Sequence, residues 1–125
     1  MRITCIVGAR PNFMKVAPIL AAMAARPALR PRLVHTGQHY DDAMSSRFFD
    51  ALDIPAPDVH MGIGSGTHAE QVGRTMIGFE MIVRARRPDW VVVVGDVNAS
   101  CACAITASST PSTASCAASQ FACGA

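Results

Sequence analysis

Short runs of apolar residues alternate along the chain with longer stretches in which apolar residues recur at helical spacing. The runs at 3–7, 32–35 and 90–94 have the length of strands that are buried on both faces of a sheet. Helical spacing covers about 11–23, 41–52 and 68–86. Strands that alternate with helices through short connections predict an α/β fold, with a parallel sheet covered by helices on both faces.

Several residues mark where these elements begin and end. Pro11 suits the first position of a helix, where no backbone donor is needed. Thr67 and Glu70 have the spacing of a capping box at the start of the third helix. Pro18 lies inside the first helix and is expected to bend it, because proline removes a backbone donor. The glycine-rich segment 62–66 is expected to be a flexible loop, with a phosphate-binding loop as the alternative.

Polar residues gather in the loops that follow the predicted strands. These loops are 8–15, 36–40 and the segment that starts at Gly95. In a parallel sheet, ligands bind beyond the carboxyl ends of the strands. The order of the elements therefore predicts a binding site at this edge of the sheet.

The end of the chain departs from this pattern. Residues 97–125 contain no Asp, Glu, Lys, Arg or His, and 22 of these 29 residues are Ala, Ser, Thr or Cys. The wet face of a surface helix or strand normally carries charged residues, and this stretch has none. One weak helix is predicted over about 100–107, and Pro111 prevents it from continuing further.

Three explanations of this tail compete. A zinc site of Cys101, Cys103, Cys116 and Cys123 is disfavoured, because the C-x-C pair lacks the usual knuckle spacing. A flexible low-complexity linker is the second explanation. The third, which we favour, is that the reading frame is lost soon after Asp96. We therefore divide the chain into an incomplete amino-terminal domain at 1–98 and an atypical tail at 99–125, frameshifted or disordered.

Composition and charge limit the function classes. The chain has 125 residues, half of them apolar, which is room for one α/β domain. Its formal net charge of +2 gives no sign of a nucleic-acid surface or a membrane patch. The first residues lack the apolar run of a signal peptide, so a cytoplasmic location is the default expectation.

Arg10 and Lys15 are candidate anion-binding residues. They place a guanidinium at the start of the first helix and an ammonium about one turn later. Together with the unpaired backbone N–H groups of a helix start, they suit a phosphate or another anion. The segment is neither a Walker A loop nor a G-x-G-x-x-G fingerprint. The alternative is an ordinary solvated helix terminus.

The other two loops contribute Gln38, His39 and Asp96. A lone loop histidine is more often a surface or capping residue than a catalyst. Asp96 follows four valines at the mouth of a strand, where a carboxylate is costly unless it is paired or functional. It can equally cap the next helix. His35, His60 and His68 show no metal-ligand spacing and are assigned structural roles.

Taken together, these segments resemble the non-hydrolysing UDP-N-acetylglucosamine (UDP-GlcNAc) 2-epimerases. The order and spacing of the motifs match over residues 1 to about 98. The matching segments are Gly8-Ala9-Arg10-Pro11, Lys15-Val16-Ala17-Pro18, Thr36-Gly37-Gln38-His39-Tyr40-Asp41, Leu52-Asp53-Ile54-Pro55, Gly64-Ser65-Gly66-Thr67-His68-Ala69-Glu70-Gln71, Gly73-Arg74, Pro88-Asp89 and Gly95-Asp96-Val97-Asn98. Several motifs in register make this resemblance specific.

The resemblance implies that the chain is the Rossmann-like first half of a GT-B fold, with substrate bound between two such halves. It implies conversion of UDP-GlcNAc to UDP-ManNAc, for cell-surface polysaccharides, by elimination and re-addition of UDP. It implies no metal or redox cofactor, and a parent enzyme that is a homodimer. Arg10, Lys15 and Asp96 match active-site positions. Gln38 and Arg74 match contacts to a second, regulatory UDP-GlcNAc, and His39 and Asn98 are assigned to substrate binding with them.

The chain also departs from the family. The family continues past Gly-Asp-x-Asn to a segment His-Val-Glu-Ala-Gly-Leu-Arg, where this chain has Thr113 to Ser119. We therefore expect a truncated epimerase that is inactive alone. The alternatives are a non-enzymatic module that binds a sugar nucleotide or anion, and a fragment of a GT-B glycosyltransferase. Arg10 and Pro11, in place of a glycine-rich first loop, weigh against the glycosyltransferase.

Overall fold

The protein is described by a computed structural model that covers residues 1–8, 10–37, 47, 50–51, 53–94, 98–109 and 115–118, with the side chains of 10–12, 98 and 115–118 outside the description. The elements in chain order are β1 (Arg2–Val7), α1 (Arg10–Ala24), β2 (Arg30–His35), β3 (Val59–His60), α3 (His68–Ala85), β4 (Trp90–Val93), α4 (Asn98–Ser109) and β5 (Ser115–Ala118). The helix expected over 41–52 falls largely outside the described residues; residues 47, 50 and 51 are helical.

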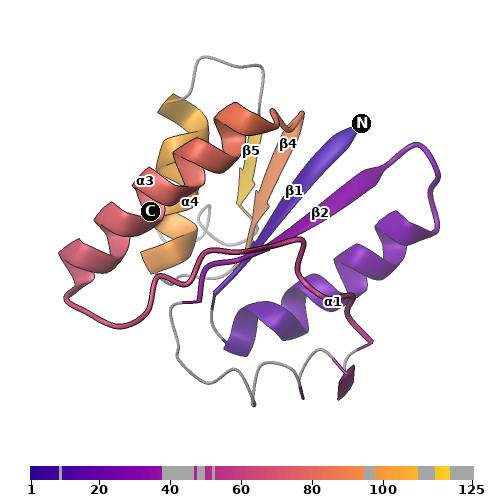
Figure 1. The fold of residues 1–125 in the computed structure, drawn as a ribbon. Coiled ribbons are helices and arrows are strands. Elements are labelled where there is room, and N and C mark those ends of the chain that lie inside the picture. Colours follow the sequence, from indigo (N-terminus) through magenta and orange to yellow (C-terminus); the bar gives the residue numbers. More distant parts are fainter. Residues whose placement is uncertain are drawn as a thin grey trace.

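The strands form one five-stranded sheet in the order β3-β2-β1-β4-β5, and every neighbouring pair is parallel. Strand β1 lies in the middle, paired with β2 on one side and β4 on the other. All carboxyl ends of the strands therefore share one edge, toward the lower part of Figure 1. The predicted parallel α/β sheet is confirmed, with strand bounds within two residues of those expected.

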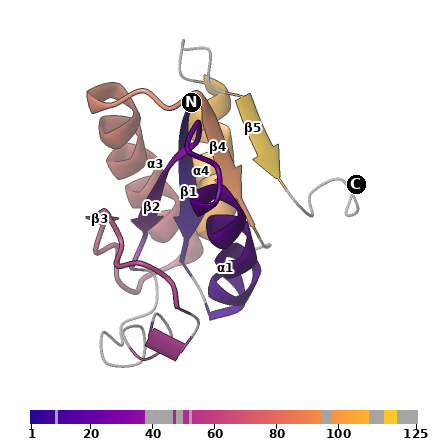
Figure 2. The same ribbon diagram turned by 90° about the vertical axis from the view of Figure 1, so that its right-hand side faces the viewer.

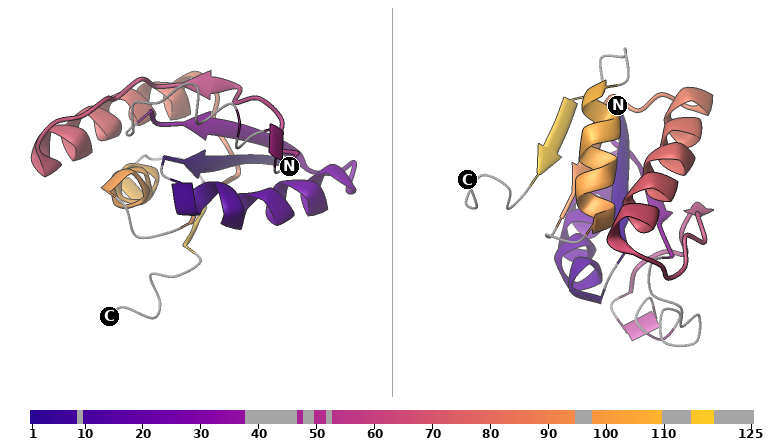
Figure 3. Two further views of the ribbon diagram at one scale, coloured as in Figure 1. Left: turned by 90° about the horizontal axis from the view of Figure 1, so that it is seen from below. Right: turned by 90° about the vertical axis from the view of Figure 1, so that its left-hand side faces the viewer.

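Helices cover both faces of this sheet. Figure 2 looks onto the face covered by α1, and the right-hand view of Figure 3 looks onto the opposite face, where α3 and α4 lie side by side. Alternate residues of β1 face the helices on the two sides of the sheet. Cys5 belongs to the core under α1, whereas Ile6 belongs to the core under α3 and α4. Burial raises the pKa of the Cys5 thiol to about 11, so the thiol stays protonated and packs as a small apolar group.

The helix boundaries follow from local chemistry. Helix α1 runs through Pro18 and ends at Ala24, before the Pro27 turn. At the start of α3 the Thr67 hydroxyl accepts the N–H of Glu70 at 3.2 Å, and the Glu70 carboxylate accepts the N–H of Thr67 at 2.8 Å. The predicted capping box is therefore confirmed. Phe79 and Val83 of α3 are buried against the sheet.

Helix α4 extends the ordered fold beyond the boundary that we placed after residue 98. The weak helix expected over 100–107 is present and longer, and it packs on α3 and the sheet, with Ala102 and Cys103 fully buried. The helix carries no charged residue, and two of its hydroxyls bond to carbonyls one turn earlier: Thr106 donates to the Ala102 carbonyl at 2.8 Å, and Ser108 to that of Ala104 at 2.9 Å. Loss of the reading frame stays a prediction.

The described part of the chain contains no helix that is both long enough and apolar enough to cross a membrane. Of the cysteines in the disfavoured zinc hypothesis, Cys101 is exposed and Cys103 is buried, so the two side chains lie on different sides of α4. Cys123 lies outside the described residues.

Candidate functional site

The carboxyl edge of the sheet brings together the starts of two helices. Helix α1 begins at Arg10, three residues after β1, and α4 begins at Asn98, five residues after β4. The Ser100 hydroxyl donates to the Val94 carbonyl at 3.1 Å and ties the first turn of α4 to the end of β4. Because the first N–H groups of a helix have no partners within it, this edge attracts anions. This is the edge at which the order of the elements predicts a site.

A stack of rings underlies this edge. His35, at the end of β2, is only 2% exposed. Its ring stacks on Phe13 of α1 with a centroid distance of 5.4 Å, and on His60 of β3 with a distance of 4.6 Å. The Nδ1 atom of His35 accepts the backbone N–H of Gly37 at 2.9 Å. These contacts join α1, β2 and β3, which agrees with the structural roles assigned to His35 and His60.

The glycine-rich segment is held more firmly than expected. Beyond β3, the backbone continues to pair with the end of β2: the N–H groups of Met61, Ile63 and Gly64 donate to the carbonyls of residues 35, 36 and 37 at 2.8, 2.9 and 2.9 Å. Within the segment 62–66, which was expected to be a flexible loop, Ile63 and Gly64 are thus held against the end of β2 by backbone hydrogen bonds. The sequence does not predict these hydrogen bonds, because they join backbone atoms and do not depend on the order of side chains in this segment.

Gly37 allows the two segments to approach. Its φ of +72° lies in the left-handed region, and a Cβ atom there would lie 3.0 Å from both the N and the Cα atom of Gly62. No L side chain fits without displacing backbone. From the sequence, Gly37 is an ordinary turn glycine. In the structure it is the point at which the segment after β2 contacts the segment after β3.

Arg74 of α3 is bonded to the other side of the glycine-rich segment. Its guanidinium donates to the carbonyls of Ile63 at 3.2 Å and Ser65 at 3.5 Å, and it lies 3.7 Å from the Glu70 carboxylate. In this arrangement Arg74 positions the loop. Its assignment to a regulatory sugar nucleotide stays a prediction.

Local hydrogen bonds keep Glu70 ionised. The pKa of its carboxyl is lowered, first by the backbone N–H of Thr67, then by its side-chain hydrogen bond with Thr67, with the Arg74 charge adding to these. A carboxylate with a lowered pKa stabilises the folded state above its unfolded pKa, and the stabilisation is lost as pH falls through the folded value.

We expect Glu70→Gln to remove an acid-sensitive part of the stability. The free energy of unfolding, measured by urea titration from about pH 7 to about pH 3, should differ most between wild type and variant at neutral pH, and the difference should shrink as Glu70 becomes protonated. A difference that stays constant over this range would contradict the role given to the Glu70 charge.

The remaining predicted site residues are placed as follows. Lys15 lies on α1 and is half-buried, about one turn after Arg10. Arg10 and Asn98 begin their helices, and their side chains lie outside the description. Gln38, His39 and Asp96 lie outside the described residues. The structure thus brings the backbone starts of α1 and α4 and the end of β2 to one edge.

Sequence reasoning missed Thr36. It follows the last residue of β2 and is fully buried, and its hydroxyl has no hydrogen-bond partner among the described residues. Buried hydroxyls are normally paired, so this one is a candidate contact for a ligand or a water at the carboxyl edge. The signals in the sequence are its position directly after a buried strand and its place in the polar loop 36–40, and neither singles out its hydroxyl.

Comparison with known proteins identifies the family. Residues 21–111 match the family model described as UDP-N-acetylglucosamine 2-epimerase. The chain belongs to the UDP-N-acetylglucosamine 2-epimerase family. The match includes α4, so the family resemblance extends beyond Asn98, where the motifs in the sequence placed its end.

Individual epimerases support this membership. The chain is 44% identical over 108 residues to a UDP-N-acetylglucosamine 2-epimerase homolog of Methanococcus maripaludis. It is 41% identical to the UDP-2,3-diacetamido-2,3-dideoxy-D-glucuronate 2-epimerase of Pseudomonas aeruginosa. Both alignments cover 86% of this chain and 30% of the relative. The chain thus spans about a third of the length of these epimerases.

The fold is that of a solved epimerase. The crystal structure of the Methanocaldococcus jannaschii UDP-GlcNAc 2-epimerase, in complex with UDP-GlcNAc and UDP, aligns with a TM-score of 0.82 and 40% identity. The alignment covers 86% of this chain and 30% of that one. The expected fold class, a Rossmann-like sheet that forms the first part of a GT-B epimerase, is therefore confirmed.

Proposed function

We propose that the chain forms the amino-terminal, Rossmann-like part of a non-hydrolysing UDP-GlcNAc 2-epimerase that interconverts UDP-GlcNAc and UDP-ManNAc. The observation that carries the proposal is the 40% identity and the TM-score of 0.82 to an epimerase solved with UDP-GlcNAc and UDP. The positions of the α1 and α4 starts support it, since both can direct backbone N–H groups to a diphosphate.

The proposed reaction is an elimination followed by an addition. The bond from C1 of the sugar to the UDP oxygen breaks, the proton at C2 is removed, and a C1–C2 double bond forms. UDP then adds back to C1 while a proton returns to the opposite face of C2. The reaction is redox-neutral, so it requires no redox cofactor.

The proposed roles follow from charge and position. Arg10 and Lys15, at the start of α1, stabilise the negative charge on the departing UDP. Asp96, after β4, takes part in proton transfer or orients the group that does. Gln38 and Arg74 contact a second, regulatory UDP-GlcNAc, and His39 and Asn98 contact the substrate. We further propose a cytoplasmic homodimer that supplies cell-surface polysaccharide synthesis.

We expect no epimerisation of UDP-GlcNAc by this chain alone, because the family's later glutamates, its later histidine and its uridine-binding half belong to other segments. In a chimera, residues 1–108 of this chain replace the matching part of the M. jannaschii enzyme. This chimera should convert UDP-GlcNAc to UDP-ManNAc, as followed by proton NMR. Lys15→Gln should lower its kcat/KM by roughly a hundredfold.

Arg26→Gln is the matched control, since it also removes one positive charge. Arg26 lies just after the carboxyl end of α1, away from the candidate site. A folded chimera without activity would contradict the proposed function. Equal losses for Lys15→Gln and Arg26→Gln would contradict the role of Lys15.

A second substrate has specific support. The P. aeruginosa relative, whose substrate is a diacetamido uronic acid attached to UDP, is as similar to this chain as the UDP-GlcNAc epimerases are. The same chimera should therefore be assayed with both sugar nucleotides. A higher kcat/KM for the uronate would assign this chain to that reaction, with the same elimination chemistry.

A further inference from the structure

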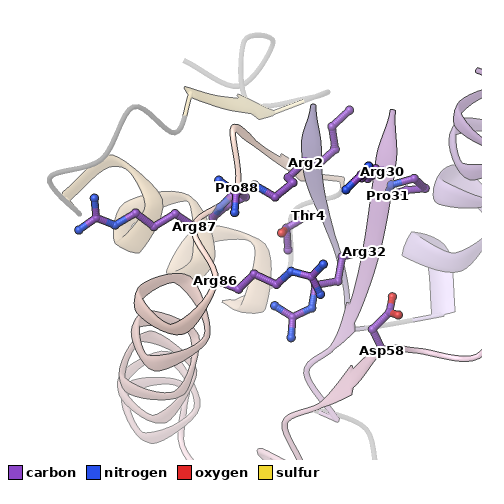
Figure 4. A pocket seen from close by; sticks show the side chains of 10 residues that line it. Arg2, Thr4, Arg30, Pro31, Arg32, Asp58, Arg86, Arg87 and Pro88 are labelled. Carbon is purple, nitrogen blue, oxygen red and sulfur yellow. The ribbon is translucent and has the colours of Figure 1, made fainter. Parts of the chain in front are cut away.

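A second charged feature lies at the opposite, amino-terminal edge of the sheet. A hollow of about 150 Å³ opens there beside the starts of β1 and β2 and the turn after α3 (Figure 4). Five arginines line it, with one carboxylate: Arg2, Arg30, Arg32, Arg86, Arg87 and Asp58. The candidate epimerase site does not include this edge.

Strand register explains why the arginines gather. Arg2 pairs with Arg30, and Thr4 pairs with Arg32, so these side chains stand in two neighbouring rows on one face of the sheet. The next row on the same face, Ile6 with Val34, belongs to the apolar core under α3 and α4. The face therefore changes from apolar to cationic within one strand. Helix α3 ends at Ala85, and the turn that follows adds Arg86.

The carboxylates near the hollow are engaged with backbone. Asp58 accepts the N–H of Leu33 at 2.8 Å, and Asp89 accepts the N–H of Arg2 at 2.7 Å. Within the described residues, the two ion pairs involve Arg74 and Arg84, neither of which lines the hollow. The hollow therefore has five arginines against the single Asp58 carboxylate, and neither described ion pair includes an arginine that lines it.

The side-chain directions favour a bound anion. Figure 4 shows Arg32 and Arg86 reaching toward each other in front of the sheet, whereas Arg87 points away. Two guanidinium groups that face each other repel, and neither can lose its proton at ordinary pH. An oxyanion between them replaces this repulsion with charge-assisted hydrogen bonds.

We propose that this hollow binds a compact phosphate-type oxyanion with at least two negative charges. Its size supports a small ligand, because about 150 Å³ is less than the roughly 300–1,000 Å³ of sites that enclose drug-sized molecules. Inorganic phosphate or pyrophosphate fits this description, and so does a terminal phosphate group whose remainder stays in solvent. Arg32 and Arg86 form the centre of the site, and Arg2 and Arg30 surround it.

Isothermal titration of the chain with inorganic pyrophosphate, at constant ionic strength, tests the proposal. The double variant Arg32→Gln/Arg86→Gln should weaken binding by at least roughly tenfold, because charge-assisted hydrogen bonds are lost. The double variant Arg26→Gln/Arg47→Gln removes the same charge from exposed positions outside the hollow, and it should retain the wild-type affinity. Added NaCl should weaken binding to the wild type.

Equal affinities of the two double variants would overturn the proposal, as would the absence of measurable pyrophosphate binding to the wild type. Circular dichroism establishes whether each variant is folded. If Arg32→Gln/Arg86→Gln is unfolded, Arg2→Gln/Arg30→Gln serves instead, because both of these side chains are exposed. Titrations with phosphate and with methyl phosphate distinguish the two sources of the anion: similar affinities indicate an attached phosphate group, and a preference for phosphate indicates the free ion.

Discussion

Gly37→Ala is expected to lower the free energy of unfolding by about 3 kcal/mol, a large share of the roughly 5–15 kcal/mol that stabilises a native domain. Two costs combine. A side chain at φ +72° costs about 1–2 kcal/mol, and its Cβ would lie 3.0 Å from the Gly62 backbone. The contacted atoms are backbone, so a rotamer change cannot relieve the contact, and Gly62 has to move away next to the hydrogen bonds that Ile63 and Gly64 donate to the end of β2.

Gly64→Ala is the matched control. Its φ of +73° carries the same backbone cost, but no atom lies within 4 Å of the Cβ position. We expect it to lose about 1–2 kcal/mol. Urea denaturation followed by circular dichroism measures both variants. If the two substitutions cost the same, the close approach of the two loops is not what requires glycine at position 37.

Phe79→Ala is expected to lower the free energy of unfolding by about 3–5 kcal/mol. Phe79 is fully buried and is the largest side chain in the core that α3 and α4 share with the sheet. Its neighbours are held by the sheet and by α4, so they cannot close the cavity. The midpoint of urea unfolding should fall, and the amount of folded protein with it.

Ile77→Ala, two residues away on α3, is the control, because Ile77 is 66% exposed. We expect a change within about 0.5 kcal/mol. A comparable loss from both substitutions would mean that the face of α3 with Ile77 is not exposed to solvent. It would also contradict the position of the core that α3 and α4 share with the sheet.

The sequence predicts the central sheet well, because each strand there is buried on both sides. A strand such as β4, with successive valines, has no reasonable alternative to a central position. The capping box of α3 was equally predictable, since it depends on contacts within four residues. Strand β3, only two residues long, owes its existence to pairing with β2 and is marked by no apolar run.

Helix α4 shows where sequence reasoning stops. The sequence predicts only a weak helix over about 100–107, and it does not show that the small side chains of α4 pack on α3 and the sheet while hydroxyls bond to carbonyls one turn earlier. In the candidate site, too, some features are predictable from the sequence and others arise only on folding. The topology predicts which edge binds a ligand, whereas the contacts of Arg74 and the burial of Thr36 depend on segments that meet only in the folded chain.

The central place of β1 has a consequence for synthesis on the ribosome. Strand β1 emerges first and can pair early with β2, some 28 residues later, but its other neighbour begins at Trp90. At about 5–20 residues per second, one side of β1 waits roughly 4–17 s for that neighbour. During this time a nascent unit of β1, α1 and β2 exposes an apolar strand edge. This unit is therefore a substrate for chaperones, and misfolding competes with folding while it persists.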